Sequence, residues 1–183
     1  MRLFVGLDLP YEMRRNLELL LHLLKPKAQI QWSSVANFHV TIKFIGEFSE
    51  ERLPALKTTL AAIPHPGVLR IAIRGLEWFP NPDQPRVLAA GIHASSGLVE
   101  LALKTDAACG QLGIEEEKRT FHPHLTLARM RAGAPLFELK KAISELPSVD
   151  FGTFSAEKFH LYRSQLDPNG SIYTKLATFG LTA

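Results

Sequence analysis

Cysteine is almost absent from this sequence: Cys109 is the only one among 183 residues. An internal disulfide is therefore excluded, and with it the small secreted folds that depend on disulfide bonds. The segment around it, DAACGQLG, is typical of the apolar side of a helix end, so we expect a buried and unreactive thiol. A chain of this kind fits a reducing compartment.

Long apolar runs are also missing. The N-terminal segment MRLFVGLDLP reaches Asp8 after a short apolar stretch, which is unlike a signal peptide. The most apolar segment, LELLLHLLK, is interrupted by Glu18 and His22 and is much shorter than the roughly 20 residues that span a bilayer. We therefore expect a cytoplasmic protein that does not enter a membrane.

The sequence lacks the glycine-rich loop of P-loop proteins and the dinucleotide-binding fingerprint, so an ATP-dependent ligase is unsupported. It also lacks a low-complexity linker, and we expect residues 1–183 to form a single domain with two lobes. Hydrophobic residues make up 46% and charged residues 21%, as in an ordinary globular protein. The net charge of +3 is compatible with a polyanionic substrate without requiring one.

What the sequence does contain is a regular succession of strand and helix patterns, with a turn signal in DPNG at 167–170. Strands are expected near 3–9, 38–46, 68–78, 86–93, 121–129, 154–164 and 171–180. Helices are expected near 11–24, 49–63, 98–112 and 135–146. The second half of the chain roughly repeats the order of the first. This order predicts an α+β fold of two similar lobes with mainly antiparallel sheets, which face each other across a central cleft with helices outside.

One four-residue phrase occurs in each half, His39-Val40-Thr41-Ile42 and His124-Leu125-Thr126-Leu127. Side chains alternate along a strand, so each histidine shares a face with its threonine, about 6.6 Å away. The same alternation sends Val40, Ile42 and Phe44 into a core. A single copy would be uninformative, but two copies in matching apolar strands favour a functional pair.

Two imidazoles and two hydroxyls suit displacement at a phosphodiester. Histidine has an unperturbed pKa near 6.5, so one ring can accept a proton while the other donates one. Threonine hydroxyls can donate hydrogen bonds to non-bridging phosphate oxygens. This chemistry requires neither a cofactor nor a metal.

The sequence resembles the 2H phosphoesterase superfamily, and within it the RNA 2′,3′-cyclic phosphodiesterases, also called 2′-5′ RNA ligases. The resemblance extends over nearly the whole chain and rests on RLFVGLDLP, NFHVTIKFIGE, FHPHLTLAR and FHLYRSQLDPNGSIYTKL. It implies that His39 donates a proton and His124 accepts one. It also implies that Thr41 and Thr126 hold phosphate oxygens and that Arg129 contacts the phosphate.

The implied reaction is hydrolysis of a 2′,3′-cyclic phosphate at an RNA end to a 2′-phosphate. With a 5′-hydroxyl RNA in place of water, the same groups would form a 2′-5′ linkage without ATP. The expected partners are RNA ends or nucleotides with a cyclic phosphate, and we expect a monomer. The alternatives are an RNA-end-binding module with weak turnover, and a related enzyme for 2′-5′ oligoadenylates or another cyclic phosphate.

Arg129 raises a difficulty, because strict alternation points it away from His124 and Thr126 unless the strand bends. An ordinary surface arginine is the alternative. Phe121 and Tyr162 are candidates for stacking on a nucleobase.

Other residues near the second motif allow two interpretations. Lys118, Arg119 and Arg131 form either a basic rim or a solvated loop. His122 orients a neighbour or marks the strand entrance, and no carboxylate or cysteine lies at ligand spacing to make it a metal ligand.

Overall fold

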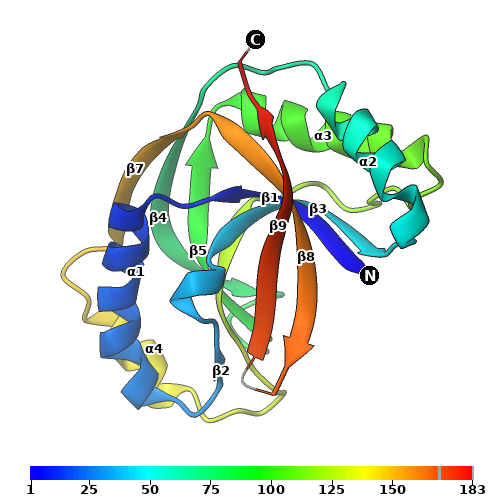
Figure 1. Ribbon diagram of the computed structural model, residues 1–183. Helices are drawn as coiled ribbons and strands as arrows, with labels where there is room; N and C mark the ends of the chain where they lie inside the picture. Colours follow the sequence, from blue (N-terminus) through cyan, green and yellow to red (C-terminus); the bar gives the residue numbers. More distant parts are fainter. Residues whose placement is uncertain (169, 183) are drawn as a thin grey trace.

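The computed structural model describes residues 1–168 and 170–182, which form two antiparallel sheets and four α-helices (Figure 1). Asn169, in the expected turn at 167–170, lies outside the described residues. The strands are β1 Arg2–Asp8, β2 Gln31–Trp32, β3 His39–Glu47, β4 Leu69–Phe79, β5 Val87–Ala94, β6 His124–Arg129, β7 Asp150–Ala156, β8 Lys158–Asp167 and β9 Gly170–Gly180. The helices are α1 Tyr11–Leu24, α2 Leu53–Ala61, α3 Ser96–Gly110 and α4 Phe137–Ser144. The predicted α+β fold with antiparallel sheets is therefore confirmed.

Each sheet takes strands from both halves of the chain. The first sheet has the order β3-β1-β8-β9 and the second has the order β2-β6-β5-β4-β7. The hairpin of the first half, β4–β5, thus joins the strand of the second motif, and the last hairpin, β8–β9, joins β1 beside the first motif. The sequence predicted one strand over 154–164, but the chain leaves the second sheet after Ala156 and enters the first at Lys158.

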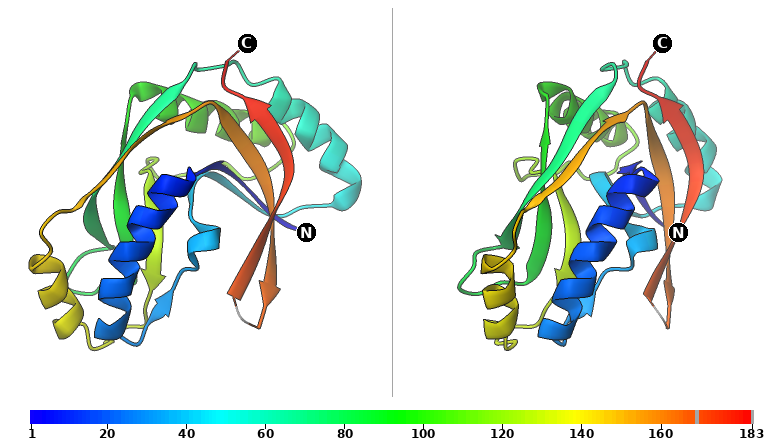
Figure 2. Two further views of the ribbon diagram at one scale, coloured as in Figure 1. Left: turned by 60° about the vertical axis from the view of Figure 1, so that its left-hand side comes forward. Right: turned by 90° about the vertical axis from the view of Figure 1, so that its left-hand side faces the viewer.

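The helices cover the two sheets separately. Helix α1 packs against β7 and α4, whereas α3 packs against β3 and α2. Figure 2 shows α1 and α4 together on one flank and the outer half of the β8–β9 hairpin on the opposite side. No helix in the described part of the chain is long and apolar enough to cross a membrane.

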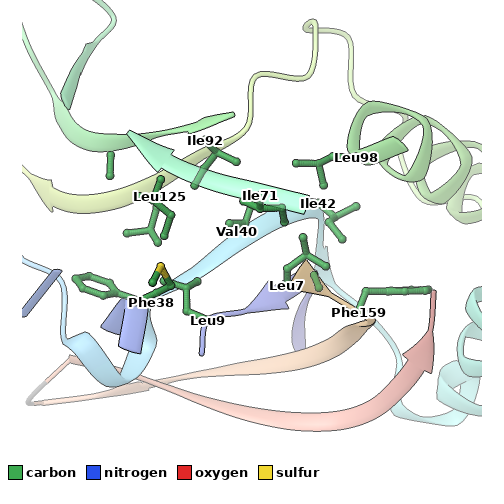
Figure 3. Packing of buried hydrophobic residues seen from close by; sticks show 14 of the residues in the cluster. Leu7, Leu9, Phe38, Val40, Ile42, Ile71, Ile92, Leu98, Leu125 and Phe159 are labelled. Atoms are coloured by element: carbon green, nitrogen blue, oxygen red, sulfur yellow. The ribbon is translucent and has the colours of Figure 1, made fainter. Parts of the chain in front are cut away.

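The strands are held by one continuous core to which both sheets contribute side chains (Figure 3). Leu7 and Val40 from the first sheet and Leu125 from the second are completely buried. Burial of one such side chain contributes roughly 1.5–3 kcal/mol, so the backbones of the two motif strands are firmly fixed. Cys109 is also buried in this core, and burial raises the pKa of its thiol to about 11. The expectation that Cys109 is buried is confirmed.

Candidate active site

The two motif strands meet at a cleft of about 1100 Å³. From β3 it is lined by His39 and Thr41, and from β6 by His124, Thr126 and Arg129. The structure therefore brings together all five residues that the sequence singled out. They come from different sheets, so the cleft lies where the two lobes face each other.

Both histidine rings are oriented by the carbonyl two residues earlier in the chain. His39 Nδ1 lies 2.7 Å from the Asn37 oxygen, and His124 Nδ1 lies 2.9 Å from the His122 oxygen. A carbonyl only accepts hydrogen bonds, so each Nδ1 carries the proton. This tautomer places the ring lone pair on Nε2. In His39 this atom accepts a hydrogen bond from the Thr41 hydroxyl at 2.9 Å.

His39 lies in an aromatic setting that disfavours its charged form. Its ring centroid is 4.5 Å from that of Phe4 and 5.2 Å from that of Tyr173. Burial lowers the pKa of His39 below its ordinary value of 6.5; the hydrogen bond to Asn37 opposes this shift, and the positive charge of Arg14 adds to it. Burial therefore favours the neutral form of this ring in the free protein.

A β-bulge in each motif strand changes which side chains face the cleft. On β6, Ala89 pairs with Thr126 but Leu88 pairs with Ala128, so Leu127 is the extra residue. A bulge reverses the alternation that follows it, and Arg129 therefore shares the face of His124 and Thr126. This removes the difficulty that strict alternation raised for Arg129.

The matching bulge on β3 overturns one expectation. Gly6 pairs with Thr41 but Val5 pairs with Lys43, which leaves Ile42 as the extra residue. Phe44 was expected in the core, yet it is 59% exposed and lines the cleft. Lys43 is instead buried.

The buried Lys43 ammonium has its charge compensated. Its Nζ lies 2.5 Å from the Asp106 carboxylate and donates to the Glu115 carbonyl at 2.6 Å. This contact ties β3 to α3 and to the connector that leads to the second motif strand.

Comparison with known proteins agrees with this geometry. Residues 7–89 and 93–173 match the family described as LigT-like phosphoesterases. The chain belongs to this family. The resemblance to the 2H phosphoesterases is thereby confirmed, and the two bulged strands are part of a LigT-like scaffold.

Relatives of this LigT-like phosphoesterase cover almost its whole length. An RNA 2′,3′-cyclic phosphodiesterase of Methanocaldococcus jannaschii is 34% identical over 174 residues, which are 94% of this chain and 96% of the relative. An RNA 2′,3′-cyclic phosphodiesterase of Thermus thermophilus is 37% identical over 193 aligned residues, which cover 99% of this chain and 90% of the relative.

Solved structures show the same fold. The crystal structure of TT0787 of Thermus thermophilus has a TM-score of 0.82 at 33% identity and covers 99% of this chain and 98% of its own. Escherichia coli LigT complexed with 3′-AMP has a TM-score of 0.82 at 25% identity and covers 100% of this chain and 98% of its own.

His122 of this LigT-like phosphoesterase is not among the described residues that line the cleft, and its Nε2 lies 2.9 Å from a carboxylate oxygen of Glu77. Its backbone carbonyl orients His124, which favours the interpretation of an orienting neighbour over a mere strand entrance. The Phe79 ring, 5.0 Å from that of His124, packs beside it. Among residues 1–168 and 170–182, no three His, Cys, Asp or Glu side chains are grouped to hold a metal ion.

Four of the residues suggested for base stacking or for a basic rim lie outside the cleft: Phe121, Tyr162, Lys118 and Arg119. Tyr162 is 6% exposed and stacks on Phe4, and Phe121 packs partly buried against the core. Lys118 pairs with Glu115 and Arg119 with Glu117, both on the exposed connector. None of these four candidates is among the described residues that line the cleft.

The sequence missed three aromatic residues that do line the cleft: Trp32, Phe44 and Tyr173. Trp32 lies in a strand of two residues, which is too short to show any periodicity. Tyr173 lies in a segment that was recognised as a strand, but nothing in the sequence showed that this strand belongs beside the first motif.

Proposed function

We propose that this protein hydrolyses the 2′,3′-cyclic phosphate at RNA ends to a 2′-phosphate. The observation that carries the proposal is one cleft that holds both motif histidines. Each ring donates a hydrogen bond from Nδ1 to a backbone carbonyl, which leaves Nε2 as the atom that can exchange a proton with the substrate. The relatives named RNA 2′,3′-cyclic phosphodiesterase supply the substrate class.

The proposed reaction starts from a complex in which His39 has taken up a proton at Nε2, which the negative charge of the bound phosphate favours, and in which His124 is neutral. The Nε2 of His124 takes a proton from a water molecule, and the water oxygen attacks phosphorus opposite the 3′ oxygen. The bond between phosphorus and the 3′ oxygen breaks, and His39 Nε2 donates a proton to that leaving oxygen. The reaction ends with His124 protonated and His39 neutral, and exchange with solvent restores the starting state. The phosphate remains on the 2′ oxygen.

The remaining polar groups stabilise the charge that develops on phosphorus. Once His39 is protonated at Nε2, the Thr41 hydroxyl no longer donates to that atom. The hydroxyls of Thr41 and Thr126 then donate to the non-bridging oxygens, and the Arg129 guanidinium neutralises their charge. Donors held by a rigid scaffold need no rearrangement during the reaction, and this makes them effective. The strands also place both histidines in advance, which reduces the entropy lost on the way to the transition state.

The direct test is an assay on an oligoribonucleotide that ends in a 2′,3′-cyclic phosphate, in excess chelator, with the product identified by phosphorus NMR. We expect multiple turnovers to a 2′-phosphate. Production of a 3′-phosphate, or dependence on added metal, would contradict the proposal. Tight binding of the RNA end without turnover would instead identify a binding module.

The same groups also support joining of RNA ends. If the 5′-hydroxyl of a second RNA takes the place of water, His124 accepts its proton and a 2′-5′ phosphodiester forms as the 3′ oxygen leaves. No ATP is consumed, because the new phosphodiester bond forms as the bond between phosphorus and the 3′ oxygen of the strained cyclic phosphate breaks. Joining should therefore appear only at high concentrations of 5′-hydroxyl RNA.

The pH dependence should reveal the low pKa of His39. The profile of kcat/KM reports the free enzyme, so we expect a bell whose lower apparent pKa lies below 6.5. A bound phosphoryl group is negative and favours the charged imidazolium, so this limb should move to higher pH in the profile of kcat. Steady-state rates from pH 5 to 9 check both expectations. A flat profile, or a limb that moves to lower pH, would contradict them.

Phe44 is proposed as the platform for the terminal base, because its exposed ring follows Thr41 on the cleft face. Stacking of one base on an aromatic ring contributes about 1–3 kcal/mol. Phe44→Ala should therefore raise KM by roughly 5- to 150-fold with a smaller change in kcat. Phe44→Tyr keeps the ring and should behave like the wild type. Equal KM values for the alanine and tyrosine variants would place the base elsewhere.

A further inference from the structure

The segment before the first motif histidine is a single turn of 3-10 helix, Val35–Asn37. The carbonyl of its last residue, Asn37, accepts the hydrogen bond from His39 Nδ1. The direction of the His39 ring therefore depends on where this turn lies. The turn has few internal hydrogen bonds of its own, so its position must be set by its neighbours. One of these is β9, where the Ser171 carbonyl accepts a hydrogen bond from the Asn37 side-chain amide at 2.5 Å.

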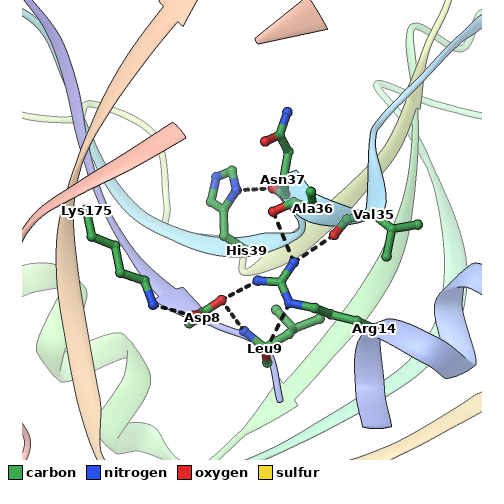
Figure 4. Close-up of polar contacts among 8 residues, drawn as sticks. All are labelled: Asp8, Leu9, Arg14, Val35, Ala36, Asn37, His39 and Lys175. Atoms are coloured by element: carbon green, nitrogen blue, oxygen red, sulfur yellow. Dashed lines mark hydrogen bonds and ion pairs between the residues drawn. The ribbon is translucent and has the colours of Figure 1, made fainter. Parts of the chain in front are cut away.

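Arg14, on α1, is the neighbour that contacts the backbone carbonyls of this turn (Figure 4). Its Nη1 donates to the Val35 carbonyl at 2.7 Å and to the Ala36 carbonyl at 3.2 Å. Its Nε donates to the Leu9 carbonyl at 3.2 Å. One guanidinium thus joins the end of β1 to the turn that precedes His39.

Asp8 holds the guanidinium from the other side. Its carboxylate accepts a hydrogen bond from Arg14 Nη2 and another, at 2.5 Å, from Lys175 Nζ (Figure 4). Burial opposes ionisation of Asp8, but these two cations outweigh it and hold its pKa below the ordinary value. Asp8 is also the residue of β1 that pairs with His39 of β3.

These contacts require an arginine. The planar guanidinium presents several donors in a fixed arrangement, and here they reach three carbonyls and a carboxylate together. A lysine would keep the charge and could still pair with Asp8, but its single nitrogen cannot reach all of these acceptors. Arg15, the next residue, is exposed on the same helix and provides a matched control.

We propose that Arg14, held by Asp8, is a positioning residue for His39: it fixes the turn whose Asn37 carbonyl sets the tautomer and direction of the ring. The inference rests on the proposed function for its kinetic consequence but not for its structural one. Arg14 does not line the cleft between the motif histidines, among the described residues that do, and it acts through the turn.

The test compares Arg14→Lys and Arg14→Gln with Arg15→Gln in two measurements. The first is imidazole nitrogen NMR above pH 7, with the His39 signals assigned by their loss in His39→Gln. In the wild type and Arg15→Gln we expect only the tautomer protonated at Nδ1. In both Arg14 variants we expect a substantial population protonated at Nε2, because the Asn37 carbonyl is no longer held in place.

The second measurement is steady-state hydrolysis of the cyclic phosphate. Both Arg14 variants should lose about 10- to 100-fold in kcat with KM changed less than threefold, as expected when geometry at the reacting atoms is disturbed. Arg14→Lys retains the charge and the pairing with Asp8, so it keeps the test valid should Arg14→Gln fold poorly.

Two results would overturn the inference: an unchanged His39 tautomer in both Arg14 variants, or a kcat within twofold of the wild type in both. The NMR experiment needs no turnover. If the wild-type protein failed to hydrolyse the cyclic phosphate, the proposed function would fall, while the spectra would still decide whether Arg14 orients His39.

Discussion

His124→Ala should lower kcat/KM for cyclic phosphate hydrolysis by about 10²–10⁴-fold, and His39→Ala should lower it by a similar factor. In the proposed mechanism, His124 accepts the proton of the attacking water, and His39 supplies the proton of the leaving oxygen. Both side chains are on the cleft side of firmly packed strands, so neither loss should be compensated by a neighbour. Rates of 2′-phosphate formation at saturating and limiting substrate measure the effect.

The control for these variants is His22→Ala, because His22 is an exposed histidine on α1 that is not among the described residues that line the cleft. Its activity should match that of the wild type, and the circular dichroism of all three variants should be native. The double variant should be only slightly slower than either single variant, since the two rings act in one step. Near-normal turnover in a folded His39→Ala or His124→Ala protein would show that its proposed role is wrong.

Arg129→Ala should lower kcat by about 10²-fold, because in the proposed mechanism its guanidinium neutralises the charge that develops on the phosphoryl oxygens. The expectation depends on the bulge at Leu127, which turns Arg129 toward the cleft. Arg129→Lys should recover only part of the activity, since an ammonium cannot make two parallel hydrogen bonds to a phosphoryl group. The measurement is kcat at saturating cyclic phosphate.

Arg131→Ala is the matched control, because Arg131 is exposed two residues further along and is not among the described residues that line the cleft. Its kcat should stay within twofold of the wild type. Equal losses in the Arg129 and Arg131 variants would mean that general positive charge, rather than the bulge-directed contact, accounts for the effect.

The fold class and the four histidines and threonines of the repeated phrase were predictable because they depend on local patterns, whereas Arg129 was suggested by the family resemblance alone. Alternation identified the strands, and the repeated phrase identified the residues that share a face. Phe44 shows where this reasoning fails. A bulge adds one residue without any mark in the sequence, and every side chain after it changes face. The same event made Arg129 hard to place and left Lys43 undetected as a buried cation.

Contacts between distant segments were the other part that the sequence did not reveal. The assignment of β4–β5 to the second motif and of β8–β9 to the first depends on pairing across the whole chain. Arg14 was similarly hidden, because it lies on an ordinary amphipathic helix and its partners are mainly backbone carbonyls. Carbonyls leave no signature in the residue types of a segment.

The central claim is that the two histidines perform opposite proton transfers at one phosphorus atom. The most direct test uses a 2′,3′-cyclic phosphate in which sulfur replaces the 3′ oxygen, with His39→Gln and His124→Gln compared on both substrates. A thiolate leaves without a proton, so His39→Gln should regain most of the wild-type rate on the sulfur compound, while His124→Gln should remain slow. Recovery of both variants, of neither, or of His124→Gln alone would contradict the assignment.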